Sequence, residues 1–285
     1  MRVLVIGARG QLGAAVAAHA RAARHDVTAL GRADLDITDA AAVLRAVAEV
    51  RPDAVINCAA YNRVDAAQIE ATQAIRANAI AVRNLVRAIG DAAFVHYSTD
   101  FVFDGSSTRP YDESDRPNPQ STYAMSKLMG EWFAAEAPRA YVLRVESLFG
   151  NAPDATPKGS VAGIVTTLLT GAPARVFEDR TVSPTNVRDA ANATLALIEM
   201  GAAPGLYHCV NSGFCTWLEL GREAARILNV PERFEIVRFA DVKLPAPRPL
   251  YCALSNAKLA AAGVPMPTWQ EALAAHVREL AAARR

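Results

Sequence analysis

The stretch RVLVIGARGQLG, residues 2–13, begins with a short apolar run and ends in three closely spaced glycines. Arg2–Ile6 is typical of a buried parallel strand, and a helix is predicted from Gln11. The spacing is G-x-x-G-x-x-G; like G-x-G-x-x-G, it permits a tight turn and a close approach of the backbone to a pyrophosphate. The helix N-terminus adds unpaired N–H groups and a partial positive charge. The stretch therefore predicts a dinucleotide-binding loop, with a merely tight strand–helix turn as the alternative.

The first half of the chain repeats this alternation of strand and helix. Four further apolar runs predict parallel strands at Asp26–Leu30, Ala54–Asn57, Ala93–Tyr97 and Ala140–Arg144. Helices are predicted at Gln11–Ala23, Asp39–Val50 (with Thr38 or Asp39 as N-cap), Thr72–Ile89 and Ser121–Ala137. Because crossovers between parallel strands are right-handed, we predict an α/β fold with a doubly wound parallel sheet, the NAD(P)-binding Rossmann fold.

The second half lacks this regular alternation of strand and helix, and its pattern predicts a smaller C-terminal α+β substrate domain. Helices are predicted at Val161–Leu169, Asp189–Met200, Thr216–Leu228 and Thr268–Ala283, short strands at Arg175–Phe177 and Gly205–Val210, and loops at Asn151–Ser160 and Pro245–Pro249. We expect the helix at Asp189–Met200 to return to the main sheet. The predicted Rossmann domain is therefore 1–147 plus about 181–204, and the substrate domain about 148–180 plus 205–285.

The composition excludes several classes of protein. The chain has 285 residues, with 30 basic and 29 acidic side chains, and a net charge of +1 gives no broad field for nucleic acid. No apolar run reaches the roughly 18 residues of a membrane span and the N-terminus lacks the pattern of a signal peptide, so we expect a cytoplasmic protein. The four cysteines form no CxxC pair and the five histidines show no metal-ligand spacing, so no metal site is predicted.

The residues after the second predicted strand bear on the choice of cofactor. An NAD-selective site often places an acidic residue there to hold the ribose 2′-hydroxyl. Here Gly31 and Arg32 take that place, and Arg32, helped by Arg9, would pair with a 2′-phosphate. We therefore expect NADPH, with NADH possible; a solvated surface charge is the alternative for Arg32. Asp36 and Ile37 follow and would edge the adenine.

Tyr123 and Lys127 are four residues apart, so a helix places both side chains on one face. A phenol has a reference pKa of about 10, and a nearby ammonium lowers that pKa. Tyr123 would then donate a proton to a carbonyl oxygen or take one from an alcohol, and Lys127 would also hold a ribose hydroxyl. An ordinary surface tyrosine and lysine are the alternative.

Polar residues also follow the strand predicted at Ala93–Tyr97, at the edge where open α/β sheets bind ligands. Thr99 would hydrogen-bond the same carbonyl oxygen as Tyr123. The alternative is that it only caps a turn. Asn57 and Asn78 would bridge neighbouring strands and loops, a structural role being at least as good an interpretation.

These motifs resemble the extended short-chain dehydrogenase/reductases, and among them the dTDP-4-dehydrorhamnose reductase family. The resemblance covers nearly the whole chain, and the order and spacing of its motifs make it specific. The matching stretches are Gly7–Gly13, Leu35–Asp39, Val55–Tyr61 with Val64 and Asp65, Ser98–Gly105, Pro119–Glu131, Ser183–Thr185, Tyr207 with His208, and Arg248 with Pro249 ahead of Lys258 and Leu259.

The resemblance implies hydride transfer from NAD(P)H to the C4 ketone of a nucleotide-linked 4-keto-6-deoxyhexose, as in dTDP-L-rhamnose or related deoxysugar biosynthesis. Thr99, Tyr123 and Lys127 fall on the catalytic positions of the family, with Tyr123 protonating the C4 oxygen. The implied cofactor contacts are Gly7, Gly10, Gln11, Leu12, Gly13, Arg32, Asp36, Ile37, Ala59, Ala60, Tyr61, Asn78, Tyr123 and Lys127. The implied substrate contacts are Thr99, Asp100, Phe101, Ser147 and Arg248, the last as a candidate for phosphate.

The chain departs from the family pattern near the sugar. Where the family commonly shows Arg-Thr-Ser-Trp-Val-Tyr-Gly, residues 144–150 read RVESLFG, so Ser147 stands in place of tryptophan. Phe101 replaces a tyrosine, and the loop Asn151–Ser160 is longer than in the best-known members. These changes leave the chemistry in place but leave the identity of the sugar open.

Two other functions stay open. One is a nucleotide-sugar epimerase or 4,6-dehydratase, although dehydratases of this superfamily carry Asp-Glu directly after the threonine, and here Asp100 and Phe101 follow Thr99. The other is a non-catalytic NADP-binding regulatory subunit, such as the β subunit of methionine adenosyltransferase, against which the intact Thr99, Tyr123 and Lys127 argue. We expect a monomer or homodimer with no nucleic-acid or membrane partner.

Overall fold

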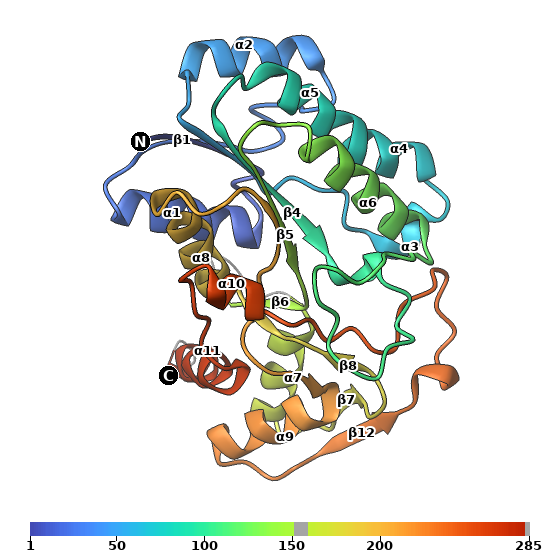
Figure 1. Ribbon diagram of the computed structural model, residues 1–285. Helices are drawn as coiled ribbons and strands as arrows, with labels where there is room; N and C mark the ends of the chain where they lie inside the picture. Colours follow the sequence, from blue (N-terminus) through green and yellow to red (C-terminus); the bar gives the residue numbers. More distant parts are fainter. Residues whose placement is uncertain (151–158, 283–285) are drawn as a thin grey trace.

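The computed structural model describes residues 1–150 and 159–282. Its centre is a six-stranded parallel sheet in the order β10-β5-β4-β3-β1-β2, so the predicted doubly wound α/β fold is confirmed (Figure 1). The strand order changes direction between β1 and β3, and open α/β sheets bind ligands at the carboxyl ends of strands around such a point. The strands are β1 Arg2–Ile6, β2 Asp26–Leu30, β3 Ala54–Asn57, β4 Ala93–Thr99, β5 Ala140–Val145 and β10 Gly205–His208.

Helices cover both faces of the sheet (Figure 1). Successive side chains of a strand point to opposite faces, and β1 follows this rule. Val3 and Val5 pack in one core with α1 and α8, whereas Leu4 and Ile6 pack in another with α2, α5 and α6. These helices are α1 Gln11–Ala22, α8 Val187–Glu199, α2 Ala40–Val50, α5 Ala81–Ala88 and α6 Thr122–Ala134. The long apolar runs of the strands are therefore explained by burial on both sides.

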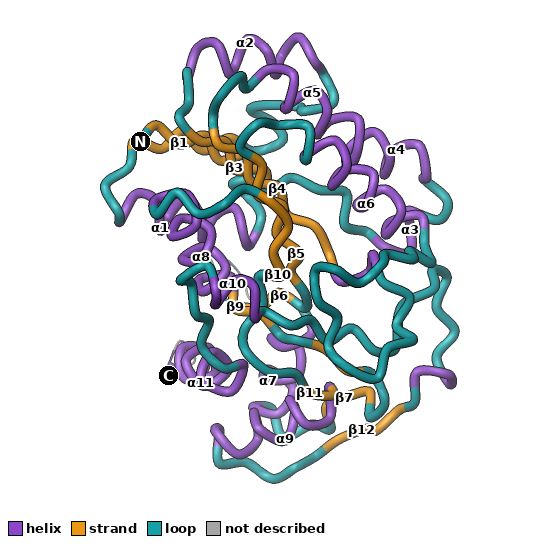
Figure 2. The backbone as a smooth tube through the Cα atoms, viewed as in Figure 1, coloured by secondary structure: helices purple, strands orange, loops and turns teal. Residues whose placement is uncertain are grey.

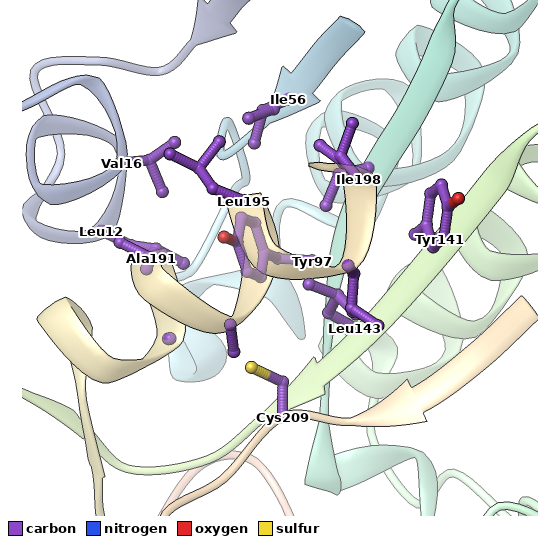
Figure 3. Close-up of a cluster of buried hydrophobic side chains, with 14 of the residues drawn as sticks. Leu12, Val16, Ile56, Tyr97, Tyr141, Leu143, Ala191, Leu195, Ile198 and Cys209 are labelled. Carbon is purple, nitrogen blue, oxygen red and sulfur yellow. The ribbon is translucent and has the colours of Figure 1, made fainter. Parts of the chain in front are cut away.

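The core between α1, α8 and the sheet joins segments far apart in the sequence. Figure 3 shows Val16 of α1 and Leu195 of α8 gathered near Tyr97 of β4. The Tyr97 hydroxyl is buried, and it forms a hydrogen bond of 2.5 Å with the Thr194 hydroxyl. The expectation that the helix near Asp189–Met200 returns to the main sheet is therefore confirmed.

Local deviations from the predicted helices have identifiable causes. The single helix predicted at Thr72–Ile89 divides into α4 (Ala71–Ile75), a π-helical turn η1 (Arg76–Ile80) and α5. Within η1, the carbonyl oxygen of Asn78 comes so close to Gly130 of α6 that a Cβ on Gly130 would lie 2.2 Å from it. A π-turn widens a helix by one residue, and this one lies where α6 presses closest. The short helix α3 (Val64–Ala67) was not predicted.

This close approach gives a stability prediction. We expect Gly130→Ala to lower the free energy of unfolding by about 1–3 kcal/mol, because the added methyl group would have to displace backbone. Urea denaturation would measure the change. Gly163→Ala in α7 (Ser160–Leu169) is a matched control: a Cβ there meets nothing within 4 Å, so the helix should gain up to about 1 kcal/mol. Equal effects of the two substitutions would contradict the packing argument.

The second half has a core of its own around α7, α9, α11 and β7. Figure 2 shows its short strands lying among these helices. Its helical elements are α7, α9 Trp217–Leu228, α10 Ala257–Ala261, α11 Trp269–Ala282 and the 3₁₀ turn η3 Phe239–Asp241. Its short strands are β6 Leu148–Phe149, β7 Ala174–Phe177, β8 Thr181–Val182, β9 Thr185–Asn186, β11 Cys215–Thr216 and β12 Phe234–Val237.

One segment lies elsewhere than expected. The strand near Gly205–Val210 was assigned to the smaller domain, but β10 pairs in parallel with β5 as the outer strand of the large sheet. The short apolar run alone does not say which sheet a strand joins. The predicted loop Asn151–Ser160 lies largely outside the described residues, and Ser160 already begins α7. Among the described helices, none has the length and apolar character needed to cross a membrane.

Candidate active site

A cleft of about 760 Å³ opens at the carboxyl ends of β1, β2 and β3, next to the glycine loop. Gly7 has a φ of +77°, and a Cβ there would lie 2.6 Å from the backbone nitrogen of Ala59. A Cβ on Gly13 would lie 2.4 Å from the carbonyl oxygen of Gly7. The loop therefore needs glycine at both positions, one for its left-handed backbone and one for close packing of α1. The predicted cofactor residues that line the cleft are Gly7, Gly10, Arg32, Asp36, Ile37, Ala59, Ala60 and Tyr61.

Other predicted cofactor residues lie away from the cleft wall. Leu12 is buried in the core beside α8, and Gln11 donates a hydrogen bond of 2.5 Å to the carbonyl oxygen of Gly150. Asn78 is buried, accepts from the backbone N–H of Tyr61 at 2.8 Å and donates to the Ser126 hydroxyl at 2.9 Å. The structure thus uses Asn78 to hold the Tyr61 loop against α6.

The charge of the cleft suits an anion. Four arginines line it: Arg9, Arg32, Arg63 and Arg76. Of the described lining residues, Asp36 alone carries a carboxyl group, and hydrogen bonds from Thr38 hold its pKa below the usual value, with Arg32 and Arg76 acting in the same direction. A dinucleotide carries several phosphate charges, so the glycine loop, the helix N-terminus and the arginines together fit this class of cofactor.

The predicted catalytic pair, Tyr123 and Lys127, lies on α6. The Ser121 hydroxyl accepts from the backbone N–H of Ala124 and so caps the helix just before Tyr123. The expected lowering of the pKa of Tyr123 by Lys127 is wrong. Burial, together with the charge of Asp100, raises this pKa to about 12, and the neighbouring Thr99 hydroxyl only partly opposes the rise. Tyr123 is therefore a neutral phenol at physiological pH, the form that donates a proton.

Lys127 is buried and reaches the sheet. Its Nζ donates to the carbonyl oxygen of Tyr97 at 2.6 Å, two residues before β4 ends at Thr99. Burial lowers the pKa of Lys127 to about 8, although the charge of Glu131 opposes this. An ammonium has three donors, so this bond leaves others for a ligand hydroxyl.

Thr99 and Phe101 lie beside Tyr123 at the carboxyl end of β4. The Phe101 and Tyr123 rings meet edge to face with centroids 5.9 Å apart. Thr99 Oγ1 donates to Asp100 Oδ1 at 2.9 Å and accepts from the Phe101 backbone N–H, so it begins the 3₁₀ turn η2 (Asp100–Val102). The guanidinium of Arg180 lies 5.5 Å from the centre of the Phe101 ring.

A buried ion pair supports this edge of the sheet. Arg144 donates from Nε and Nη2 to the two carboxylate oxygens of Glu131, at 2.9 and 2.7 Å. The Ser98 hydroxyl donates to Glu131 Oε1 at 2.5 Å. Burial and the positive charge of Arg144 lower the pKa of His208 to about 3, so His208 stays neutral beside the pair. The network ties α6, β4, β5 and β10 together beneath Lys127.

The other residues predicted to contact the substrate, Ser147, Arg248 and Asp100, differ in exposure and in hydrogen-bond partners. Ser147 is partly exposed with a φ of +42°, a left-handed backbone that is uncommon away from glycine. Arg248 donates twice to the carboxylate of Asp65, at 2.9 and 2.8 Å, so its guanidinium holds the loop after Pro245 onto α3. Asp100 is buried, and its carboxyl group lies in a cluster with Glu146 and Cys252.

A second cavity of about 310 Å³ lies in the smaller part of the molecule, between α7, β7 and α9. Its wall includes Arg175, Arg180, Phe177 and Trp217. Arg180 also lies over the ring of Phe101, which packs on Tyr123, so this cavity is connected to the Tyr123 region through these side chains. The sequence singled out neither Arg180 nor Glu146, because neither belongs to a short motif with a recognisable spacing.

The fold and the site together define an extended short-chain dehydrogenase/reductase: a Rossmann sheet, a glycine loop and a Tyr–Lys pair beside a strand-end threonine. Residues 1–282 match the family model described as RmlD substrate binding domain. The chain belongs to the dTDP-4-dehydrorhamnose reductase family.

Three relatives illustrate the similarity. The chain is 38% identical to dTDP-4-dehydrorhamnose reductase of Mycobacterium tuberculosis, over 96% of this chain and 91% of that protein. It is 35% identical to a probable dTDP-4,6-dihydroxy-2-methyloxan-3-one 4-ketoreductase of Streptomyces antibioticus, over 96% and 93%. The crystal structure of dTDP-4-dehydrorhamnose reductase from Bacillus anthracis in complex with NADP has a TM-score of 0.91 at 32% identity, covering 98% of this chain and 99% of that one.

Proposed function

We propose that this chain uses NADPH to reduce the C4 ketone of a nucleotide-linked 4-keto-6-deoxyhexose. The observation that carries the proposal is the meeting of Thr99, Tyr123 and Lys127 at the end of β4, beside an arginine-lined cleft. The names of the relatives, which describe reductases of dTDP-linked ketosugars, support this substrate class.

The chemistry divides between the cofactor and the protein. NADPH, when bound, supplies the hydride. Tyr123 donates its phenol proton to the C4 oxygen as negative charge develops there. Thr99 orients the same oxygen through its hydroxyl. Lys127, anchored at the carbonyl of Tyr97, holds a ribose hydroxyl with its remaining donors.

The cofactor proposal rests on the arginines of the cleft. We expect Arg32→Ala to weaken the binding of NADPH by roughly tenfold or more, since one charge-assisted hydrogen bond is worth about 1.5–3 kcal/mol. NADH binding should change little, because NADH lacks the 2′-phosphate. Titration of the intrinsic fluorescence with each cofactor would measure both affinities. Arg45→Ala on the exposed face of α2 is the control, and equal losses for NADPH and NADH would refute the role.

The cavity lined by Arg175 and Arg180 is the proposed place for the nucleotide diphosphate part of the substrate. Two guanidinium groups suit the phosphates, and the Phe177 and Trp217 side chains offer apolar surface for a base. From there the sugar would extend past Phe101 to Tyr123. Arg248 is a weaker candidate for phosphate, because binding would have to compete with Asp65.

The proposal includes an organisation in two domains. Residues 1–147 with about 181–204 would bind the cofactor, to which we now add β10, and the other residues would bind the sugar nucleotide. We further propose a cytoplasmic monomer or homodimer with no nucleic-acid or membrane partner, in keeping with a net charge of +1.

The decisive experiment is a panel of nucleotide-linked 4-ketosugars assayed with NADPH and NADH, with the product configuration read by NMR. Oxidation of NADPH with formation of the C4 alcohol is the expected result. Binding of NADPH with no turnover on any ketosugar would favour the regulatory subunit. Conversion of a sugar nucleotide without net oxidation of the cofactor would favour an epimerase or dehydratase.

A further inference from the structure

Two buried carboxyl groups lie together behind Thr99. Asp100 follows β4 and Glu146 follows β5, two strands that lie side by side in the sheet (Figure 1). One oxygen of each, together with the sulfur of Cys252, lies within 4.8 Å of the others. The exposed fractions of Asp100 and Glu146 are 4% and 2%. Water therefore screens the repulsion between negative charges on these two groups only weakly.

The hydrogen bonds of the pair leave two oxygens without a partner. Asp100 Oδ1 accepts from the Thr99 hydroxyl at 2.9 Å, and Glu146 Oε2 accepts from the backbone N–H of Ser183 at 2.6 Å. Asp100 Oδ2 and Glu146 Oε1 are buried and form no hydrogen bond with any residue that the structure describes. A proton on Glu146 Oε1 would make it a donor toward Asp100 Oδ2, directly or through one water molecule. A single proton would thus satisfy both atoms.

The surrounding charges support only one anion. Within residues 1–150 and 159–282, Arg180 is the cation beside the pair, and its Nη2 lies 3.9 Å from the sulfur of Cys252. The other titratable groups that face the pair are Tyr123 of α6, Tyr251 and Cys252 of the C-terminal loop, and Cys215 of β11. Burial raises the pKa of each of these four groups, so all are neutral at physiological pH. Two carboxylates sharing one guanidinium would leave an uncompensated buried charge.

We propose that Glu146 is a neutral carboxylic acid that restores the proton of Tyr123 through Asp100 and Thr99. Glu146 acts through other residues, so it is a positioning and proton-supplying residue. Its role as a proton supply rests on the proposed reductase function. Burial and the charge of Asp100 raise the pKa of Glu146 well above its usual value, which agrees with the geometry. Burial also raises the pKa of Asp100 to about 6, although Arg180 opposes this.

The transfer balances without a further reactant. After Tyr123 has given its proton to the sugar oxygen, its phenolate takes the hydroxyl proton of Thr99. Asp100, which is ionised at the start, takes the Oε1 proton of Glu146 on its own Oδ2. Rotation of the protonated carboxyl group then turns this O–H toward Thr99, which accepts the proton as it gives up its own. Each O–H bond that breaks is replaced by one that forms, and the net result is a neutral Tyr123 and an ionised Glu146. Solvent then returns one proton to Glu146, the proton that the overall reduction consumes.

A cluster of two carboxyl groups and a thiol is also the kind of site that binds a metal ion. Here the positive charge of Arg180 disfavours a bound cation. A divalent ion would need the Cys252 sulfur as a thiolate, whereas burial raises the pKa of that thiol. It would also have to sit beside a guanidinium that already contacts this sulfur. A proton shared by the two unpartnered oxygens provides the missing hydrogen bond without placing a divalent charge beside the guanidinium.

Infrared difference spectroscopy tests the protonation without any substrate. We expect wild-type protein at neutral pH to show the C=O stretch of a buried protonated carboxylic acid, shifted in D₂O and absent from Glu146→Gln. Glu49→Gln on the exposed face of α2 is the control and should leave the band unchanged. A wild-type spectrum without the band, or a band that survives in Glu146→Gln, would overturn the assignment. The wild-type spectrum decides even if the variant fails to fold.

Kinetics test the supply of the proton. Glutamine is also a neutral donor of nearly the same shape, so a purely structural Glu146 would tolerate Glu146→Gln. We expect instead a kcat lower by about tenfold or more, with an unchanged affinity for NADPH. In the wild type, kcat should fall as the pH rises through the pKa of Glu146, and this limb should be absent from the variant. An unchanged kcat and pH profile would refute the proton supply.

The two readouts separate this proposal from the proposed function. If no ketosugar is reduced but the infrared band is lost in Glu146→Gln, the reductase function fails together with its proton supply, and the neutral glutamic acid stands. If ketosugars are reduced and the band is absent from the wild type, the reductase function stands and the assignment of Glu146 fails.

Discussion

Tyr123→Phe should lower kcat by about 10²–10⁴-fold, the range that a positioned general acid contributes. Phenylalanine keeps the ring that packs edge to face on Phe101 but removes the hydroxyl that we propose gives a proton to the C4 oxygen. The affinity for NADPH should stay close to that of the wild type, because the arginines and the glycine loop are untouched. Steady-state kinetics with a reactive ketosugar and a fluorescence titration with NADPH would measure the two quantities.

Tyr141→Phe is the matched control for this prediction. The Tyr141 hydroxyl donates to the carbonyl oxygen of Ala202, and Tyr141 lies near the amino end of β5, whereas the cleft lies at the carboxyl ends of the strands. Its loss should cost some stability and leave kcat unchanged. A Tyr123→Phe enzyme that turns over at the wild-type rate would disprove the assignment of Tyr123 as the proton donor.

Arg144→Met should lower the free energy of unfolding by about 3–5 kcal/mol, because it leaves the Glu131 carboxylate buried without its cation. Glu131 receives two hydrogen bonds from Arg144, and both side chains are buried. The hydrogen bond from the Ser98 hydroxyl would remain, and Lys127 would be a neighbouring positive charge that forms no hydrogen bond with this carboxylate. Urea denaturation followed by circular dichroism would measure the loss.

Two further variants separate charge from packing. Arg144→Met combined with Glu131→Met removes both charges, and we expect it to recover much of the lost stability. Arg226→Met breaks an exposed pair with Glu223 on α9, and its effect should be far smaller. If the single and double variants at the buried pair were equally unstable, the lost packing of Arg144 rather than the unpaired carboxylate would be the cause.

The large sheet was predictable because its strands are short, apolar and separated by helices. Alternate side chains such as Val5 and Ile6 pack on opposite faces, and this double burial produces the runs that the sequence shows. The π-helical turn at Arg76–Ile80 was not predictable, because it depends on the approach of Gly130 from another helix. The pairing of β10 with β5 likewise depends on contacts between residues about 60 positions apart.

The candidate site was predictable where residues with chemical roles are close in sequence. Tyr123 and Lys127 are one helical turn apart, and the glycine loop is continuous, so both leave a readable pattern. Arg180 and Glu146 come from segments with no such pattern and meet Asp100 only in the folded chain. The state of Tyr123 was predicted wrongly for a related reason: spacing shows which groups are near, whereas burial decides how they titrate.

The position of α8 and β10 has a consequence for synthesis of the chain on the ribosome. The first five strands are complete by Val145, but the helix that covers their face beside α1 begins only at Val187, and the outer strand ends at His208. About 60 further residues must therefore be translated before this apolar face and the free edge of β5 are covered. A nascent chain in that interval exposes an apolar surface that favours aggregation, so we expect the pace of translation over residues 146–208 to affect the yield of folded protein.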